Sequence, residues 1–115
     1  MKTVAVFLAF TAIAVAPAVA EGEFKSGKAL KDGLQGWFGS DTVDTLIKDA
    51  LAAGYVIGVH DALSGSLVCT PPDINQGEVL EQVLTFLNSH QDRLTESADR
   101  LVAAALAERW ACRQG

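Results

Sequence analysis

The sequence predicts an all-α fold, a small disulfide-stapled bundle of about four helices. Three observations support this fold class. Apolar residues recur at helical spacing along most of the chain, strand-type alternation is scarce, and residues with helix-capping chemistry stand before three of the apolar segments. A short chain buries a smaller share of its surface than a long one, so it gains from a covalent cross-link. We therefore expect helices with short connections around one core.

The first 20 residues predict a secretory signal peptide, which leaves a helical domain at residues 21–115. Lys2 gives a short basic start, residues 3–15 are almost entirely apolar, and Ala18 and Ala20 form an A-x-A cleavage site. An uncleaved membrane anchor is the alternative, although the apolar run is short for a membrane span. With the signal peptide removed, no membrane segment remains, and the default location is the periplasm.

The glycine-rich start of the domain predicts a short helix at about residues 25–34, followed by Trp37 and Phe38, which should anchor it on the core. A longer helix should start at Asp41, whose side chain can cap free backbone N–H groups. Ser64-Gly65-Ser66 should stop it after about Leu63. Its apolar residues repeat at i, i+3 and i+4, namely Val43, Leu46, Ile47, Ala50, Leu51, Gly54 and Tyr55.

Residues 67–72 should form an extended connection, because Pro71-Pro72 excludes helix. Asn75 and Glu78 have the spacing of a capping box and predict a third helix, which ends near Ser89. Thr95 is the expected cap of a last helix that leads to Trp110. The apolar stripes of these two helices are Val79, Leu80, Val83, Leu84, Phe86 and Leu87 in the third, and Ala98, Leu101, Val102, Ala105 and Leu106 in the last.

Two cysteines, Cys69 and Cys112, are expected to pair, because an exported chain enters an oxidising compartment. The bridge would tie the connection after the second helix to the end of the domain. The alternative is a nucleophilic Cys69 with His60 as its base, since catalytic residues need only be close in space. The available partner cysteine and the oxidising compartment favour the disulfide.

The sequence gives little support for an enzyme, a metal site or a cofactor. His60 and Asp61 are neighbours on a helix, where successive side chains diverge, so we expect them to be surface residues and not a facing pair. His90 follows the third helix, where a cation complements the helix dipole. Two histidines this far apart make no metal signature, and phosphate-loop, nucleophile-elbow and zinc-protease motifs are absent from the sequence.

The net charge of the chain and a line of small residues indicate which partners the protein could bind. Without Lys2 the chain has eight basic and fourteen acidic side chains, a net charge of −6 that argues against nucleic acid and anionic membrane surfaces. A basic protein partner is compatible with this charge. Ala50, Gly54 and Gly58 recur every four residues, next to Tyr55, and would let another backbone approach closely. This line predicts either helix packing within the domain or a homodimer contact.

Three segments carry a family resemblance: "AAGYVIGVHDAL", "VCTPPDINQGEVLEQVLTFLNSHQDRL" and "ADRLVAAALAERWAC". In order and spacing they resemble the Rap/Tai family, which includes immunity proteins against type VI secretion amidase effectors. The resemblance covers residues 24–112. Ala52 stands where the family commonly has a cysteine, and the partner cysteine expected near residues 34–38 is also absent. The positions that match the family are Gly54, Tyr55, Gly58, Val59, Cys69, Pro71, Gln76, His90, Trp110 and Cys112.

The resemblance implies a small periplasmic helical protein, often dimeric, that binds a secreted cell-wall amidase and blocks its active-site cleft. The candidate plug is the segment 61–73, because a stiff, tethered loop loses little entropy on binding. Its expected contact residues are His60, Asp61, Ser64, Ser66, Leu67 and Asp73. The alternative function is a small periplasmic stress chaperone of the HdeA type, which has a similar disulfide-stapled helical build.

Overall fold

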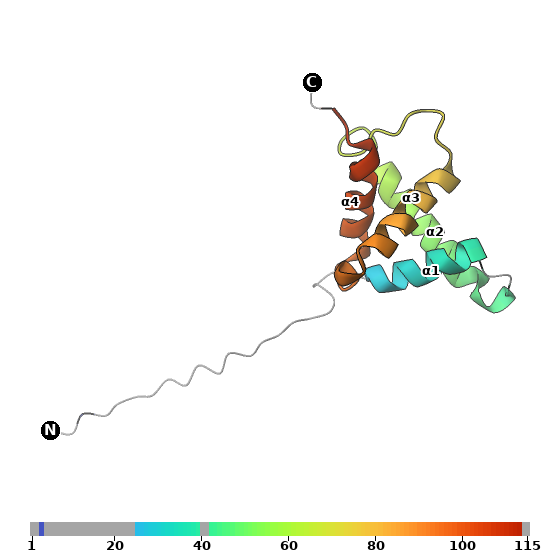
Figure 1. The fold of residues 1–115 in the computed structure, drawn as a ribbon, viewed down its shortest axis with the longest axis vertical. Helices are drawn as coiled ribbons and strands as arrows, with labels where there is room; N and C mark the ends of the chain where they lie inside the picture. The colour runs from blue at the N-terminus through green and yellow to red at the C-terminus, as the bar shows by residue number, and fades with distance from the viewer. Residues whose placement is uncertain (1–2, 4–24, 40–41, 114–115) are drawn as a thin grey trace.

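The computed structural model describes residues 3, 25–39 and 42–113, and nearly all of their regular structure is helical. The elements are α1 (Gly27–Gly39), α2 (Val43–Leu63), α3 (Gln76–Ser89), the short 3-10 helix η1 (Gln91–Arg93) and α4 (Ala98–Trp110) (Figure 1). β-type pairing in these ranges is confined to isolated bridges. The predicted all-α class is confirmed. Of the predicted signal peptide only Thr3 lies within the described residues, and the expected cap Asp41 lies outside them.

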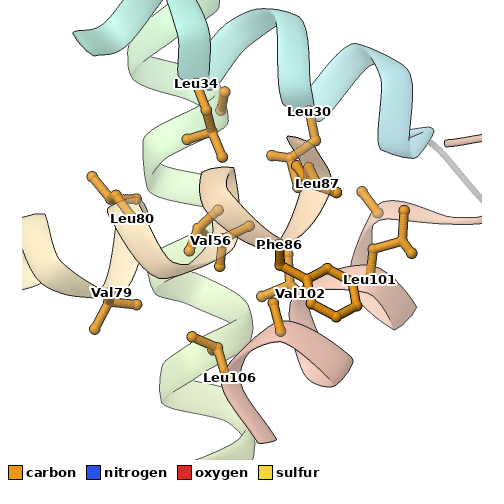
Figure 2. Close-up of a cluster of buried hydrophobic side chains, with 14 of the residues drawn as sticks. Leu30, Leu34, Val56, Val79, Leu80, Phe86, Leu87, Leu101, Val102 and Leu106 are labelled. Atoms are coloured by element: carbon orange, nitrogen blue, oxygen red, sulfur yellow. The ribbon is translucent and has the colours of Figure 1, made fainter. Parts of the chain in front are cut away.

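The four α-helices pack around one core, and α2 contacts each of the other three. Figure 1 shows α1 across one end of the molecule, while the chain between α2 and α3 arches over the opposite end. The apolar stripes predicted for α3 and α4 do face inward, apart from Leu84, which is only half-buried. Figure 2 shows their side chains meeting those of α1 and α2, among them Leu30, Leu34, Val56, Leu80, Phe86, Leu87, Leu101, Val102 and Leu106.

The start of α3 is the predicted capping box. The Asn75 side chain accepts a hydrogen bond from the Glu78 backbone N–H at 2.9 Å, and the Glu78 carboxylate accepts one from the Asn75 N–H at 3.0 Å. Together the two bonds satisfy two backbone donors that a helix start otherwise leaves unpaired. The end of α3, at Ser89, is also where the sequence predicts it.

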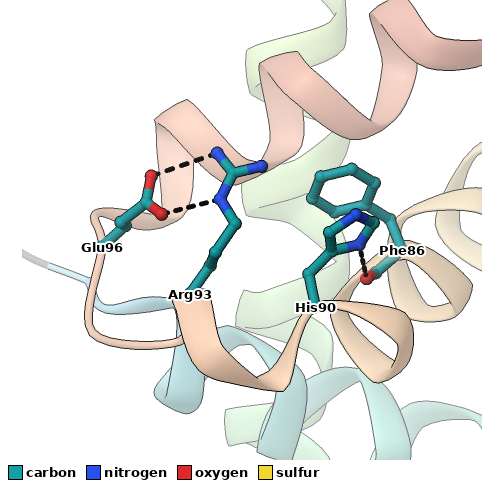
Figure 3. A network of polar contacts seen from close by, with 4 residues as sticks. All are labelled: Phe86, His90, Arg93 and Glu96. Carbon is teal, nitrogen blue, oxygen red and sulfur yellow. Dashed lines mark hydrogen bonds and ion pairs between the residues drawn. The ribbon is translucent and has the colours of Figure 1, made fainter.

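The corner between α3 and α4 is held by side chains of α3, of η1 and of the residues on either side of η1 (Figure 3). The His90 Nδ1 donates to the Phe86 carbonyl at 2.7 Å, and the two rings stack with centroids 3.9 Å apart. Arg93 donates two hydrogen bonds to the Glu96 carboxylate, at 2.7 and 3.1 Å. These hydrogen bonds lower the pKa of the Glu96 carboxyl below its usual range and raise the pKa of Arg93.

This corner also completes the start of α1. The N–H groups of Gly27 and Lys28 donate to the carbonyls of Glu96 and Leu94, at 2.9 and 3.0 Å. The Ala98 N–H returns a bond to the Lys25 carbonyl, also at 2.9 Å. The first two donors of α1 are thus satisfied by a distant segment of the chain, while the Ala29 N–H is capped locally by the Ser26 hydroxyl at 3.2 Å.

Two predictions about helix starts and ends are wrong. α1 continues to Gly39 instead of ending near residue 34, because Gly33 and Gly36 do not break it. They lie where α1 meets α2: a Cβ at Gly33 would overlap the Cβ of Ala52. α4 begins after Ser97, not after Thr95. Residues 93–96 form a turn, closed by a hydrogen bond from the Glu96 N–H to the Arg93 carbonyl at 3.0 Å, so the chain enters the helix two residues later.

The orientation of Trp37 and Phe38 is a further difference from the prediction. We expected both rings to anchor α1 on the core, yet they are 44% and 49% exposed. The core contacts of α1 are made instead by Leu34 and Leu30, which are fully buried one and two turns earlier. The rings lie on the last turn of the lengthened helix, beyond the reach of the core.

Most of the apolar stripe predicted for α2 also faces away from the core, whereas its last member, Tyr55, is half-buried against the core. Val43, Leu46, Ile47 and Leu51 are 82%, 56%, 73% and 64% exposed. The residues that face inward are Asp49, Ala52, Ala53 and Val56. α2 is apolar on both sides, so the periodicity offers two possible core faces. The small side chains of Ala52 and Ala53 allow α1 to approach closely, and this second face is the one that the fold buries.

Two glycine substitutions test this geometry. Gly33→Ala should lower the free energy of unfolding by about 1–3 kcal/mol, because its methyl group overlaps Ala52 in a packed interface. Gly54→Ala, on the exposed side of α2, should raise it by roughly 0.5–1 kcal/mol, because no other described residue meets its Cβ and alanine favours helix. Urea unfolding followed by circular dichroism measures both. Equal effects at the two positions would contradict the described packing.

Candidate partner-binding site

The connection between α2 and α3, residues 64–75, is here called the tethered loop. Its main tether is a disulfide between Cys69 and Cys112, with Cα atoms 4.8 Å apart, as the sequence predicts. Backbone hydrogen bonds flank the bridge: the Cys69 N–H donates to the Trp110 carbonyl at 2.8 Å, and the Cys112 N–H to the Leu67 carbonyl at 3.2 Å. A bonded cystine sulfur is no thiolate, so the alternative of a nucleophilic Cys69 is excluded in this structure.

The first half of the tethered loop is a tight turn around the last residue of α2. The Leu63 carbonyl lies 3.0–3.1 Å from the N–H groups of Ser66, Leu67 and Val68, and it also accepts from the Ser66 hydroxyl at 3.0 Å. Gly65 has a φ of +85°, a left-handed conformation that glycine adopts without strain. The turn buries Val68 completely and leaves Leu67 46% exposed.

His60 joins the end of α2 to the second half of the loop. Its Nε2 lies 2.9 Å from the Thr70 hydroxyl, and its Nδ1 lies 3.0 Å from the Asp61 carboxylate. The carboxylate can only accept, so Nδ1 donates to it, and the second hydrogen bond joins Nε2 to the Thr70 hydroxyl. The expectation that His60 and Asp61 cannot pair is therefore wrong. The side chains of adjacent helical residues start out in diverging directions. At the end of α2, however, the Asp61 carboxylate still comes within hydrogen-bond distance of the His60 ring.

The structure brings most of the predicted contact residues together at one end of the molecule. Asp61, Ser64, Ser66 and Leu67 are exposed around the turn, whereas His60 is half-buried beneath the loop. Asp73 is exposed further along, after the two prolines. The arrangement presents hydroxyl groups and one apolar side chain between two carboxylates, on a backbone that is fixed from both sides.

A groove beside the tethered loop was not predicted. It has a volume of about 320 Å³ and lies between the last turns of α2 and the start of α4. Its walls are mostly apolar, with a carboxylate and a guanidinium on the α4 side. The lining residues are Val59, Ala62, Leu63, Asp99, Arg100 and Ala103. No sequence signal indicates it, because it forms only where two helices far apart in the chain meet.

The described part of the chain shows neither a metal-holding cluster nor a membrane-spanning helix. Within residues 25–39 and 42–113, no three His, Cys, Asp or Glu side chains are placed to hold a metal ion. None of the helices in these ranges has the length and apolar character needed to cross a membrane.

Comparison with known families decides what kind of protein this is. The family model of Rap1a immunity proteins matches residues 26–112. The chain belongs to this family. The match extends from the start of α1 to the disulfide, so it covers the whole helical domain, and it confirms the Rap/Tai resemblance. A comparison with curated proteins found no match. Membership implies an immunity role through binding an effector protein, and proteins of this family are generally not enzymes. It favours the immunity role over the alternative of a stress chaperone.

The positions that carry the Rap/Tai resemblance are largely structural in this Rap1a-family protein. Cys69 and Cys112 form the tether, Trp110 is buried beside it, and His90 stacks on the α3–α4 corner. Ala52, where the family commonly has a cysteine, packs on Gly33 of α1. Close contact between two small residues thus joins α1 and α2 here without a second bridge.

Proposed function

We propose that this Rap1a-family protein is a periplasmic immunity protein that binds and occludes a peptidoglycan amidase effector of a type VI secretion system. The observation that supports occlusion is the tethered loop. Its backbone is fixed by the disulfide, by flanking backbone bonds and by the His60–Thr70 contact, while Leu67 and its neighbouring hydroxyls remain exposed. A loop already ordered before binding gives up little conformational entropy when it enters a cleft.

The chemistry of the tethered loop suits an enzyme cleft. Leu67 is an apolar side chain that a cleft can desolvate, and Ser64 and Ser66 offer hydroxyl groups to backbone or polar groups along its walls. Asp61 and Asp73 place carboxylates at the two ends of the segment. They add to the net charge of −6 of the chain without Lys2, which would speed association with a basic partner surface.

The variant Leu67→Glu tests the loop assignment. The backbone N–H and carbonyl of Leu67 hold the turn, so a side-chain change at this exposed position leaves the fold intact. The binding partner in this test is a purified secreted peptidoglycan amidase from the same or a neighbouring strain. We expect its affinity to fall roughly 30-fold or more, because a charge replaces an apolar side chain that the proposed complex would bury. Inhibition of peptidoglycan hydrolysis in vitro should weaken in parallel.

The matched control is Asn88→Glu, an exposed position on α3 that introduces the same charge away from the loop. It should bind and inhibit like the wild type, and both variants should keep the helical circular dichroism spectrum. Full binding by Leu67→Glu would disprove the loop assignment. Binding to an effector with an unrelated activity would keep the immunity role and disprove the amidase target.

A further inference from the structure

The groove between α2 and α4 is a surface that the proposed function leaves without a role. It has a volume of about 320 Å³, and its walls are apolar except for Asp99 and Arg100 on the α4 side. The structure shows no ion pair between either of these charged groups and another described residue. A concave, mostly apolar surface with a few polar groups is the usual form of a binding site. Its occupant must bring an apolar group together with a charge.

One end of the groove lies where the chain enters the domain. The Lys25 carbonyl accepts a hydrogen bond from the Ala98 N–H of α4 at 2.9 Å, and the Lys25 ammonium lies over the Tyr55 ring of α2, 5.9 Å from its centroid. Lys25 thus contacts both helices. The groove begins one residue further along α4, at Asp99, and one turn further along α2, at Val59. From there it runs between the two helices toward the tethered loop.

The four residues before Lys25 are long enough to occupy this groove. These residues 21–24 have the sequence EGEF, lie outside the described residues, and would start the mature chain after the predicted cleavage. Four residues extend over about 13 Å at most. From the level of Tyr55 to Leu63, at the far end of the groove, α2 rises about 12 Å. A segment fixed at Lys25 therefore reaches every residue that lines the groove.

The side chains of this segment also match the groove in chemistry. Phe24 comes immediately before the anchored residue and supplies a large apolar group for the half-buried walls at Val59 and Ala103. Glu23 supplies a carboxylate for the Arg100 guanidinium, and a hydrogen bond between two charged groups is among the stronger ones in proteins. The segment thus provides both of the groups that the groove requires, in adjacent residues.

We propose that residues 21–24 bind in the groove between α2 and α4, with the Phe24 ring on its apolar walls and the Glu23 carboxylate on Arg100. Burial of the ring and of the walls that it covers drives the contact. The anchor at Lys25 makes the contact intramolecular, with an effective concentration in roughly the millimolar range, so a weak contact is sufficient for occupancy. The bound segment covers the space between the two helices up to the edge of the tethered loop.

Methyl NMR of the chain, expressed with its own leader, tests the contact. In the wild type the methyl groups of Val59, Leu63 and Ala103 should show nuclear Overhauser effects to the Phe24 ring. Phe24→Ala should remove these effects and shift the same methyl resonances, because an aromatic ring no longer covers them. The control Phe38→Ala removes an exposed ring at the end of α1 and should leave them unchanged. Methyl resonances that are the same in the wild type and Phe24→Ala would overturn the proposal.

Charge reversal tests the pairing of Glu23 with Arg100. Arg100→Glu should weaken the Overhauser effects between the Phe24 ring and the Ala103 methyl, because two carboxylates then face each other. The double variant Glu23→Arg/Arg100→Glu should restore them, which a general disturbance of α4 would not allow. The control Arg109→Glu, exposed near the far end of α4, should have no effect. Wild-type effects in Arg100→Glu, or no recovery in the double variant, would contradict the pairing.

The amidase-binding experiment separates this inference from the proposed function. Phe24→Ala should still bind the amidase, because the disulfide and the backbone hydrogen bonds of the tethered loop hold it independently of residues 21–24. Loss of amidase binding by Phe24→Ala, with no ring contacts in the free wild type, would assign Phe24 to the effector and overturn the proposal. Failure of Leu67→Glu to affect amidase binding would leave the NMR results unchanged.

Discussion

Removal of the Cys69–Cys112 disulfide in a Cys69→Ser/Cys112→Ser variant is expected to lower the free energy of unfolding by about 4 kcal/mol. The bridge joins residues 43 positions apart, and the chain-entropy model assigns this amount to a closed loop of that length. Small domains have a net stability of only about 5–15 kcal/mol, so the bridge supplies a large share. Guanidinium unfolding of the oxidised wild type and the double variant measures the difference.

The native structure should nevertheless form without the bridge. Val68 remains buried, and the backbone bonds from Cys69 to Trp110 and from Cys112 to Leu67 do not involve sulfur. The double variant should therefore keep its helical circular dichroism spectrum at 25 °C and unfold at lower denaturant. A reducing agent should destabilise the wild type alone. Equal stability of wild type and variant would contradict the assigned role of the bridge.

The second large effect is expected in the core. Leu101 of α4 is fully buried and lies against Gly27 at the start of α1, so Leu101→Ala removes contacts in the centre of the domain. We expect a loss of about 3 kcal/mol in the free energy of unfolding, from lost burial and an unfilled cavity. Thermal unfolding should shift down by more than 10 °C, at about 4–8 °C per kcal/mol for a domain of this size.

Ile47→Ala is the matched control for the core prediction. Ile47 is an apolar helix residue that points away from the core, so its truncation should change the stability of the monomer by less than about 0.5 kcal/mol. Measurement at low protein concentration keeps any pairing of α2 faces out of the result. A cost similar to that of Leu101→Ala would show that the apolar stripe of α2 does face the core.

The sequence predicts α3 well because its signals are local. Asn75 and Glu78 form a capping box from side chains three residues apart, and the apolar stripe that follows has only one possible core side. α2 lacks this property, because both of its faces are apolar. The buried face of α2 is set by the close contact of Ala52 with Gly33 of α1. The apolar pattern of α2 alone does not reveal that contact.

The candidate site shows the same division. The disulfide is predictable, because the sequence has only two cysteines and its predicted signal peptide directs the chain to an oxidising compartment. The contact of His60 with Thr70 and the groove beside Asp99 and Arg100 are not, because both depend on how distant segments meet. The exposure of Leu67 follows from the turn at Gly65. The sequence predicts that Ser64-Gly65-Ser66 ends the helix, but not which side chains the turn exposes.

The corner that completes α1 has a consequence for biosynthesis. The N–H groups of Gly27 and Lys28 find their acceptors at Glu96 and Leu94, which the ribosome adds nearly seventy residues later. A nascent chain that ends before these residues leaves the first turn of α1 open and the core without α4. Contacts between segments this far apart slow folding, since a long loop must close before they form. The domain thus becomes stable only once the segment that carries Leu94, Glu96 and α4 has joined the rest of the chain.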